Sequence, residues 1–324
     1  MKTDLVSIII PVYNGSNYIR QAINCALNQT YKNIEIIVVN DGSTDNGMTE
    51  KICLEYQNKI RYFFKENGGV SSALNFGIKK MRGKYFSWLS HDDLYSLDRI
   101  EKMVANIDKS STNEILFSNF AYIDENNKVL CKTHFERFRD INLNYQYAIY
   151  RGLLCGLTLL IPKSAFEEIT LFDENLKCVQ DYMAFFKFLK KYKYRLVKEC
   201  TAFSRVHSKQ VTLNSPKMQY ENAFLWKFII DNTPNETILA LKHDNYSFYD
   251  DLSKFLKYNN ISEEAYIYCI KKRDMYPLKK HKRINCSILY PLSLFEKMLF
   301  YLRKDGIIMI IKKVVRRFFY EKRV

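Results

Sequence analysis

The chain has 324 residues, of which 47% are hydrophobic and 26% are charged. This apolar content is ample for a folded core and excludes a disordered or fibrous protein. The formal net charge of +15 is unevenly placed, because residues 271–324 carry 16 Lys and Arg against 4 Asp and Glu. The charge therefore points to a basic tail rather than to a uniformly basic protein.

The cysteines and the apolar runs indicate the cellular compartment of the protein. The eight cysteines are scattered singly, without a C-x-x-C pair, in a chain too large to need disulfides, so we expect mostly reduced thiols in a cytosolic protein. The apolar run at residues 6–12 is too short for a signal peptide, and no run reaches the roughly 18 to 20 apolar residues that span a bilayer. We expect a soluble or peripheral protein.

Strand-like and helix-like patterns alternate through the first hundred residues. Apolar, β-branched runs predict strands, and segments of helical spacing lie between them. The strands are predicted at 6–12, 34–39, 60–64 and 84–89, and the helices at about 17–29, 46–57 and 69–81. Continuous hydrophobic strands that alternate with helices are typical of a mostly parallel sheet covered on both faces. The predicted fold class is α/β.

The pattern changes from about residue 114 but shows no linker before about residue 210. Strands are predicted at 114–123, 157–161, 194–197 and 202–206, with helical segments at 165–169 and within 172–192. Beyond about residue 215 the chain is helical and rich in aromatic residues. The first 210 residues are therefore interpreted as one continuous domain with a helical C-terminal extension.

The basic tail, residues 271–324, ends in an amphipathic helical pattern with cations on one half and apolar side chains on the other. Such a helix suits the surface of an anionic membrane. The alternative is a helix that packs on the α/β domain with a solvated cationic face. Nucleic acid is not the expected partner, because base-stacking aromatics are not interleaved with the cations.

Polar turns follow three of the predicted strands, where α/β sheets bind their ligands. They lie at 13–15, 40–43 and 90–93. Asp92 and Asp93 suit Mg²⁺ or Mn²⁺, which takes one or two carboxylates and completes its shell with phosphates, although either residue could instead cap the helical segment from about Leu97. Asp41 could bond a nucleotide or serve only the turn. Neither G-x-G-x-x-G after the first strand nor a P-loop is present.

Five segments, in this order, resemble the family 2 glycosyltransferases of GT-A fold. They are "VSIIIPVYNGSNYIRQAINCALNQTYKNIEIIVVNDGSTD", "NGGVSSALNFGI", "SWLSHDD", "FDENLKCVQDYMAF" and "RVH". The resemblance covers about residues 5–210 and implies a Rossmann-like GT-A domain. It implies a nucleotide-sugar-binding half at 1–110 and an acceptor-binding, catalytic half at 111–215, followed by a helical, basic amphipathic region at 216–324.

The resemblance also implies roles for individual residues. Asp41 would contact the base, typically uracil, and Asp181 would be the catalytic base. A divalent metal, Mn²⁺ or Mg²⁺, would join the diphosphate to Asp92, Asp93 and His207. The residues implied in nucleotide-sugar binding are Pro11, Val12, Tyr13, Asn14, Asp41, Asn75, Asp92 and Asp93.

Departures from the family pattern leave alternatives open. Ser90 stands where an acid is common, so either Asp92 or Asp93 could be the principal metal ligand. Gln180 replaces the first acid of the usual "ED", and Leu74 replaces an arginine often seen before Asn75. Asp181 near a helix start could simply meet the helix dipole, and His207 could be structural.

The expected activity is inverting, metal-dependent transfer of a hexose or N-acetylhexosamine from a UDP-sugar to a glycan acceptor, lipid-linked, in bacterial polysaccharide synthesis. The metal would neutralise the leaving diphosphate, and Asp181 would take the proton of the attacking hydroxyl. The expected location is the cytoplasm, peripheral at the inner face of the cell membrane. The alternatives are a sugar-nucleotide binder that has lost transfer, and a nucleic-acid-binding protein that uses the basic tail.

Overall fold

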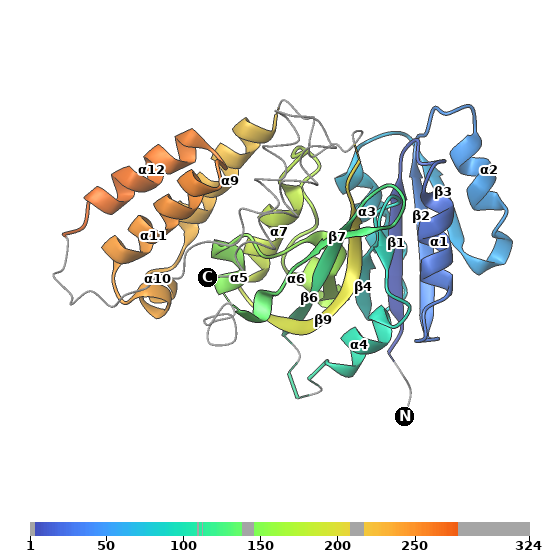
Figure 1. Cartoon of the computed structure of the whole chain (residues 1–324), viewed down its shortest axis with the longest axis horizontal. Coiled ribbons are helices and arrows are strands. Elements are labelled where there is room, and N and C mark those ends of the chain that lie inside the picture. Colours follow the sequence, from blue (N-terminus) through green and yellow to red (C-terminus); the bar gives the residue numbers. More distant parts are fainter. Residues whose placement is uncertain (1–3, 109, 112, 138–145, 208–216, 278–324) are drawn as a thin grey trace. The chain divides into compact units, whose positions relative to one another are not determined.

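The structure is a computed structural model that describes residues 4–108, 110–111, 113–137, 146–207 and 217–277 (Figure 1). The described residues fall into two compact units. The first comprises those up to 149 together with 154–207, and the second comprises 150–153 and 217–277.

The first part of unit 1 is a parallel α/β arrangement. Its strands are β1 (Val6–Val12), β2 (Ile34–Asp41), β3 (Arg61–Lys65) and β4 (Tyr85–Trp88), which pair in the order β3-β2-β1-β4. Helices α1 (Ile19–Leu27), α2 (Met48–Leu54) and α3 (Val70–Lys80) connect them, with a short 3-10 turn at Gln57–Lys59. All seven residues of β1 are buried, as the continuous apolar run predicted.

The rest of unit 1 extends the same sheet with antiparallel pairs and one long parallel pair. β4 pairs antiparallel with β8 (Leu159–Pro162), and β8 does so with β6 (Glu114–Ile123). β6 then pairs parallel with β9 (Lys193–Arg205) and antiparallel with β7 (Val129–Lys132), and β9 pairs with the two-residue β5 (Leu94–Tyr95). The α/β class is confirmed. The sheet, which has nine strands among the described residues, is mixed rather than mostly parallel, because β8, β7 and β5 pair antiparallel whereas β1 to β4 and the β6–β9 pair are parallel.

Shorter helices complete unit 1. They are α4 (Arg99–Ala105), α5 (Tyr147–Tyr150), α6 (Lys163–Glu168) and α7 (Gln180–Phe188), with 3-10 turns at Phe135–Arg137 and Gly156–Thr158. Helix α5 ends at the first residue of unit 2, Tyr150. The two strands predicted at 194–197 and 202–206 are one strand, β9, whose register against β6 shifts on both sides of Asn119. The seven cysteines in the described part of the chain are free thiols, as expected.

Unit 2 is helical in its described part. It contains α9 (Met218–Asn232), α10 (Asn235–Lys242), α11 (Asn245–Tyr258) and α12 (Glu263–Asp274). The side chains of Asp244 and Ser262 cap α11 and α12 by accepting main-chain N–H bonds. Within the described ranges, no helix has the length and apolarity to cross a membrane. Most of the basic tail, residues 278–324, lies outside the described residues.

Candidate functional site

The aspartate turn, residues 90–93, is anchored to the end of β4. The Tyr95 hydroxyl donates to the Trp88 carbonyl at 2.5 Å and lies 2.8 Å from the Ser87 hydroxyl, so the chain turns back tightly into β5. Helix α4 begins at Arg99, with Asp98 as its N-cap. The alternative that Asp92 or Asp93 caps this helix is therefore wrong.

Asp92 and His207 form the central pair of the site. The Asp92 Oδ2 atom lies 2.9 Å from His207 Nε2, although 115 positions separate the two residues. Burial alone would raise the pKa of Asp92, but the hydrogen bond to His207 and the neighbouring imidazole of His91 hold this pKa below its usual value. The pair offers one carboxylate oxygen and one imidazole nitrogen side by side.

Asp93 faces a different partner. Its Oδ1 atom accepts the main-chain N–H of Arg205 at 2.8 Å, and its side chain is only 7% exposed. Burial, and then the charge of Asp92, raise the pKa of Asp93 well above its usual value. Asp92 rather than Asp93 therefore lies against the imidazole of His207, whereas Asp93 holds the turn to the end of β9.

Asp41 ends β2 and is almost completely buried. Its Oδ1 atom accepts from Lys65 Nζ at 2.7 Å and from the Gly68 N–H at 3.1 Å, and its Oδ2 atom accepts from the Gly69 N–H at 2.7 Å. The carboxylate thus holds the loop that leads into α3. Such a buried, charge-assisted set of bonds fixes the loop backbone.

The turn after β1 is hydrogen-bonded to the segment that follows β2. Asn14, in the left-handed region at φ 49°, accepts the Thr44 N–H on its Oδ1 atom at 2.7 Å, while its own N–H donates to the Ser43 hydroxyl at 2.9 Å. Pro11 and Val12 are buried, whereas the Tyr13 side chain is 46% exposed. Tyr13 and Asn14 are therefore the members of this group that are open to a ligand, and of the two only Tyr13 offers an aromatic ring.

Gly15, the last residue of the turn after β1, permits close packing on the aspartate turn. A Cβ atom on Gly15 would lie 2.5 Å from His91 Cδ2, which is closer than real Cβ contacts come. The structure therefore brings the turns after β1, β2 and β4 together at one edge of the sheet, where the sequence predicted them.

Asn75 lies within the fold. Its Nδ2 atom donates to the Phe172 carbonyl at 2.8 Å and to Glu174 Oε1 at 2.9 Å, and its Oδ1 atom accepts the Phe172 N–H at 3.0 Å. Asn75 thus joins α3 to the segment before α7, and the neighbouring Leu74 is completely buried.

Asp181 lies in the first turn of α7. Burial raises the pKa of its carboxyl to about 6, and the hydrogen bond that it accepts from the Tyr182 N–H, at 2.8 Å, offsets this only in part. An acid that merely met the positive end of a helix would have a lowered pKa. The surroundings of Asp181 therefore disfavour its charge.

Cys155, which no sequence motif indicated, lies near both the aspartate turn and Asp181. Burial first, and then the charges of Asp93 and Asp181, raise the pKa of its thiol to about 12. Cys155 thus lies within electrostatic reach of both carboxylates. Next to Asp181, the side chain of Gln180 is 5% exposed, and its Oε1 atom has no hydrogen-bond partner among the described residues.

The sequence patterns also did not indicate Arg205 and Tyr18 as residues of the site. The guanidinium of Arg205 lies 4.5 Å above the ring of Tyr18, and this ring lies 5.5 Å from that of His207. The only available sequence signal for Arg205 was its place in "RVH", two residues before the histidine.

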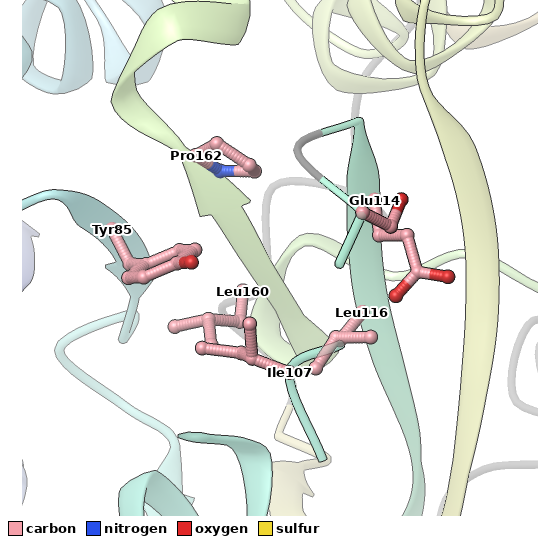
Figure 2. A pocket seen from close by; sticks show the side chains of 7 residues that line it. Tyr85, Ile107, Glu114, Leu116, Leu160 and Pro162 are labelled. Carbon is pink, nitrogen blue, oxygen red and sulfur yellow. The ribbon is translucent and has the colours of Figure 1, made fainter. Parts of the chain in front are cut away.

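A small pocket lies away from this site, at the amino end of β4 (Figure 2). Tyr85, Glu114, Leu160 and Pro162 are among the residues that line it. Its volume of about 20 Å³ has room for one water molecule. The aspartate turn follows the opposite end of β4, so this pocket has no part in the candidate site.

Comparison with known proteins identifies the family. The family described as "Glycosyl transferase family 2" matches residues 7–170. The chain belongs to glycosyltransferase family 2. An uncharacterized glycosyltransferase of Rickettsia bellii is 44% identical over 265 residues, which cover 81% of this chain and 38% of that protein. The chain therefore spans less than half the length of this relative.

Solved structures show the GT-A fold. S. aureus TarS (residues 1-349) in complex with UDP-GlcNAc superposes with a TM-score of 0.61 at 18% identity, covering 98% of this chain and 92% of that chain. The mannosyltransferase PcManGT of Pyrobaculum calidifontis, in complex with GDP-Man and Mn²⁺, gives a TM-score of 0.56 at 11% identity, covering 99% and 89%. The family and the fold expected from the sequence are confirmed.

Proposed function

We propose that this protein is an inverting, metal-dependent glycosyltransferase that moves a hexose or N-acetylhexosamine from a UDP-sugar to a glycan acceptor. One observation carries the proposal. The Asp92–His207 pair lies at the carboxyl end of β4, and Cys155 is within electrostatic reach of both Asp93, in the same turn, and Asp181, whose pKa is raised. The candidate metal site, Asp92 and His207, and the candidate base, Asp181, thus lie in the same unit.

Asp92 and His207 would hold the divalent metal, Mn²⁺ or Mg²⁺. An oxygen and an imidazole nitrogen suit Mn²⁺, and no group of three ligating side chains occurs among the described residues, so donor phosphates and water would complete the shell. When bound, the metal would neutralise charge on the diphosphate as it leaves. The Mn²⁺ bound by PcManGT supports this proposal. Asp93 would brace the turn through the N–H of Arg205.

Asp181 would act as the general base. With a pKa of about 6 it is ionised at neutral pH and yet basic enough to accept a proton from an acceptor hydroxyl. The hydroxyl oxygen then bonds to the anomeric carbon as the bond to the diphosphate breaks, and the proton passes to Asp181. A single displacement of this kind inverts the anomeric centre.

The nucleotide would lie across the turns after β1 and β2. Tyr13 offers an exposed ring to the base, and Asp41 would act at the base site together with the Gly68–Gly69 loop that it holds. Asn75 would contribute by fixing the segment before α7. The UDP-GlcNAc bound by TarS favours a uridine donor.

The acceptor would be a lipid-linked glycan of bacterial polysaccharide synthesis, and the protein would act at the inner face of the cell membrane. The basic composition of residues 271–324 supports an anionic membrane as a partner. Of this segment the structure describes only 271–277, where Lys272 pairs with Asp231 and Arg273 with Asp250.

A donor screen tests the function. The purified chain is incubated with UDP-, GDP- and dTDP-sugars and Mn²⁺, with and without a lipid-linked acceptor, and nucleotide release is followed. We expect release of UDP that EDTA abolishes. Release of GDP or dTDP alone would overturn the donor assignment. Tight UDP binding without transfer to any acceptor would favour the alternative, a sugar-nucleotide binder that has lost transfer.

A further inference from the structure

Arg205, the last residue of β9, is completely buried and bonded on several sides. Its Nε atom donates to the Asp92 carbonyl at 2.7 Å. One terminal nitrogen donates to the carbonyls of Asp124 and Glu125, at 3.1 and 3.2 Å, and the other donates to Gln21 Oε1 at 3.1 Å. The Nε atom and both terminal nitrogens of the guanidinium are thus bonded to the protein itself.

The same residue holds both aspartates of the turn. Its side chain binds the carbonyl of Asp92, and its main-chain N–H binds the carboxylate of Asp93 at 2.8 Å. Its guanidinium also stacks on Tyr18, whose ring lies against His207. Arg205 therefore fixes the backbone beneath one member of the Asp92–His207 pair and supports the ring of the other.

The choice of arginine has a physical reason. A buried guanidinium is costly unless hydrogen bonds satisfy it, and a rigid fork directed at main-chain oxygens locks the backbone segments that carry them. Here the fork joins the aspartate turn to the loop at 124–125 and to α1. A lysine cannot replace it, because its single ammonium cannot reach acceptors on three sides at once.

We propose that Arg205 is a positioning residue that sets the distance and orientation of the Asp92–His207 pair for the metal-bound diphosphate, without touching the donor itself. This inference rests on the proposed function. Groups that orient metal ligands typically change metal affinity or activity by about 10- to 100-fold when they are replaced. Replacing Arg205 should therefore change UDP binding when the metal is present and leave metal-free UDP binding unchanged.

The test compares Arg205→Lys with Arg99→Lys. Arg99 is also completely buried, but its bonds go to Ser118, Thr201 and the Leu159 carbonyl. Its guanidinium lies 4.3 Å above the ring of Tyr95, and none of these contacts is to Asp92 or His207. UDP binding is measured by calorimetry in Mn²⁺ and in EDTA, beside the melting temperature and the Mn²⁺ concentration for half-maximal UDP release.

We expect both variants to melt earlier, and only Arg205→Lys to weaken UDP binding in Mn²⁺ and to raise the half-saturating Mn²⁺ concentration, each by about tenfold or more. Its UDP binding in EDTA stays close to that of the wild type. Equal Mn²⁺ dependence in the two variants, or an unchanged one in Arg205→Lys, would overturn the inference.

A second pair of variants keeps the test informative if Arg205→Lys does not fold. Tyr18→Phe keeps the ring between Arg205 and His207, and Tyr18→Leu removes it from a partly exposed position. We expect a severalfold rise in half-saturating Mn²⁺ in Tyr18→Leu and almost none in Tyr18→Phe. The same value in both would contradict the inference.

Failure of the proposed function gives a different result. A wild type that binds UDP with Mn²⁺ but transfers no sugar overturns the transferase activity, while the binding measurements still decide the role of Arg205. A wild type that shows no Mn²⁺-dependent UDP binding overturns both.

Discussion

The raised pKa of Asp181 predicts that this side chain lowers the stability of the folded protein. The carboxyl titrates at about 6 in the fold, against 3.8 for an ordinary Asp, and one pKa unit corresponds to about 1.4 kcal/mol. Ionised Asp181 therefore costs at most about 3 kcal/mol. Asp181→Asn has nearly the same shape without the charge, so we expect it to be more stable at pH 8 by up to this amount.

The direction of the pH dependence shows whether the charge of Asp181 causes the stability difference between the wild type and Asp181→Asn. The folded protein binds the proton of Asp181 more tightly than the unfolded chain does, so the wild type loses stability relative to the variant as the pH rises from 3.8 through about 6. The difference should fall to roughly half at pH 5 and vanish below about pH 3.8. Urea unfolding at several pH values measures it.

Asp98→Asn is the matched control. Hydrogen bonds from Lys102 and Ser96 lower the pKa of Asp98, so its ionised form stabilises the fold above the ordinary pKa and the stabilisation is lost as the pH falls. For this exposed pair we expect a loss of at most about 1 kcal/mol at pH 8. A destabilised Asp181→Asn at pH 8, or a stability difference independent of pH, would refute the reasoning.

Three further predictions follow from the same geometry. Gly156→Ala would place a Cβ atom 2.3 Å from Trp88 Cε3, so urea unfolding should show a loss of about 1–3 kcal/mol, and a loss below about 0.5 kcal/mol would contradict this packing. Asp41→Asn removes the charge paired with Lys65 and weakens the hold on the following loop, which should weaken UDP binding in calorimetry by about 1–3 kcal/mol. An unchanged affinity would show that the loop does not serve the nucleotide. EDTA should abolish UDP release and added Mn²⁺ should restore it in the donor assay, whereas full release in EDTA would exclude a metal requirement.

The first four strands and their turns were predictable because the physical signal is local. A run such as "VSIIIPV" has apolar residues at every position but Ser7, which is typical of a strand buried on both faces, and the turn after such a strand lies at the ligand edge. The positions of Asp41, Asp92 and Asp93 at one edge followed from this pattern alone.

Strand pairing beyond β4 was not predictable in the same way. Apolar runs do not show whether a strand pairs parallel or antiparallel, and the two-residue β5 is too short to produce a pattern. Lys198 and Glu199, which lie between the two predicted strands, belong to an irregular stretch of β9, where Asn119 Nδ2 donates to the Lys198 carbonyl at 2.7 Å.

The hydrogen-bond partners of the site residues could not be predicted, because these bonds join residues far apart in the sequence. The Asp92 carbonyl and the Arg205 Nε atom belong to residues 113 positions apart, and no local pattern marks such a bond. Asn75 was expected beside the donor because of its motif, yet its amide is bonded to a segment 97 positions away. Family likeness located the motif, whereas the tertiary structure decided what the side chain contacts.

We propose that Asp181 performs the proton transfer in a site whose nucleotide and metal are held by other residues. The most direct measurement is the rate of sugar transfer by Asp181→Asn, beside its affinity for UDP in Mn²⁺. We predict a rate lower by about 10²- to 10⁴-fold, with UDP affinity within about threefold of the wild type. Transfer that persists near the wild-type rate would contradict the account.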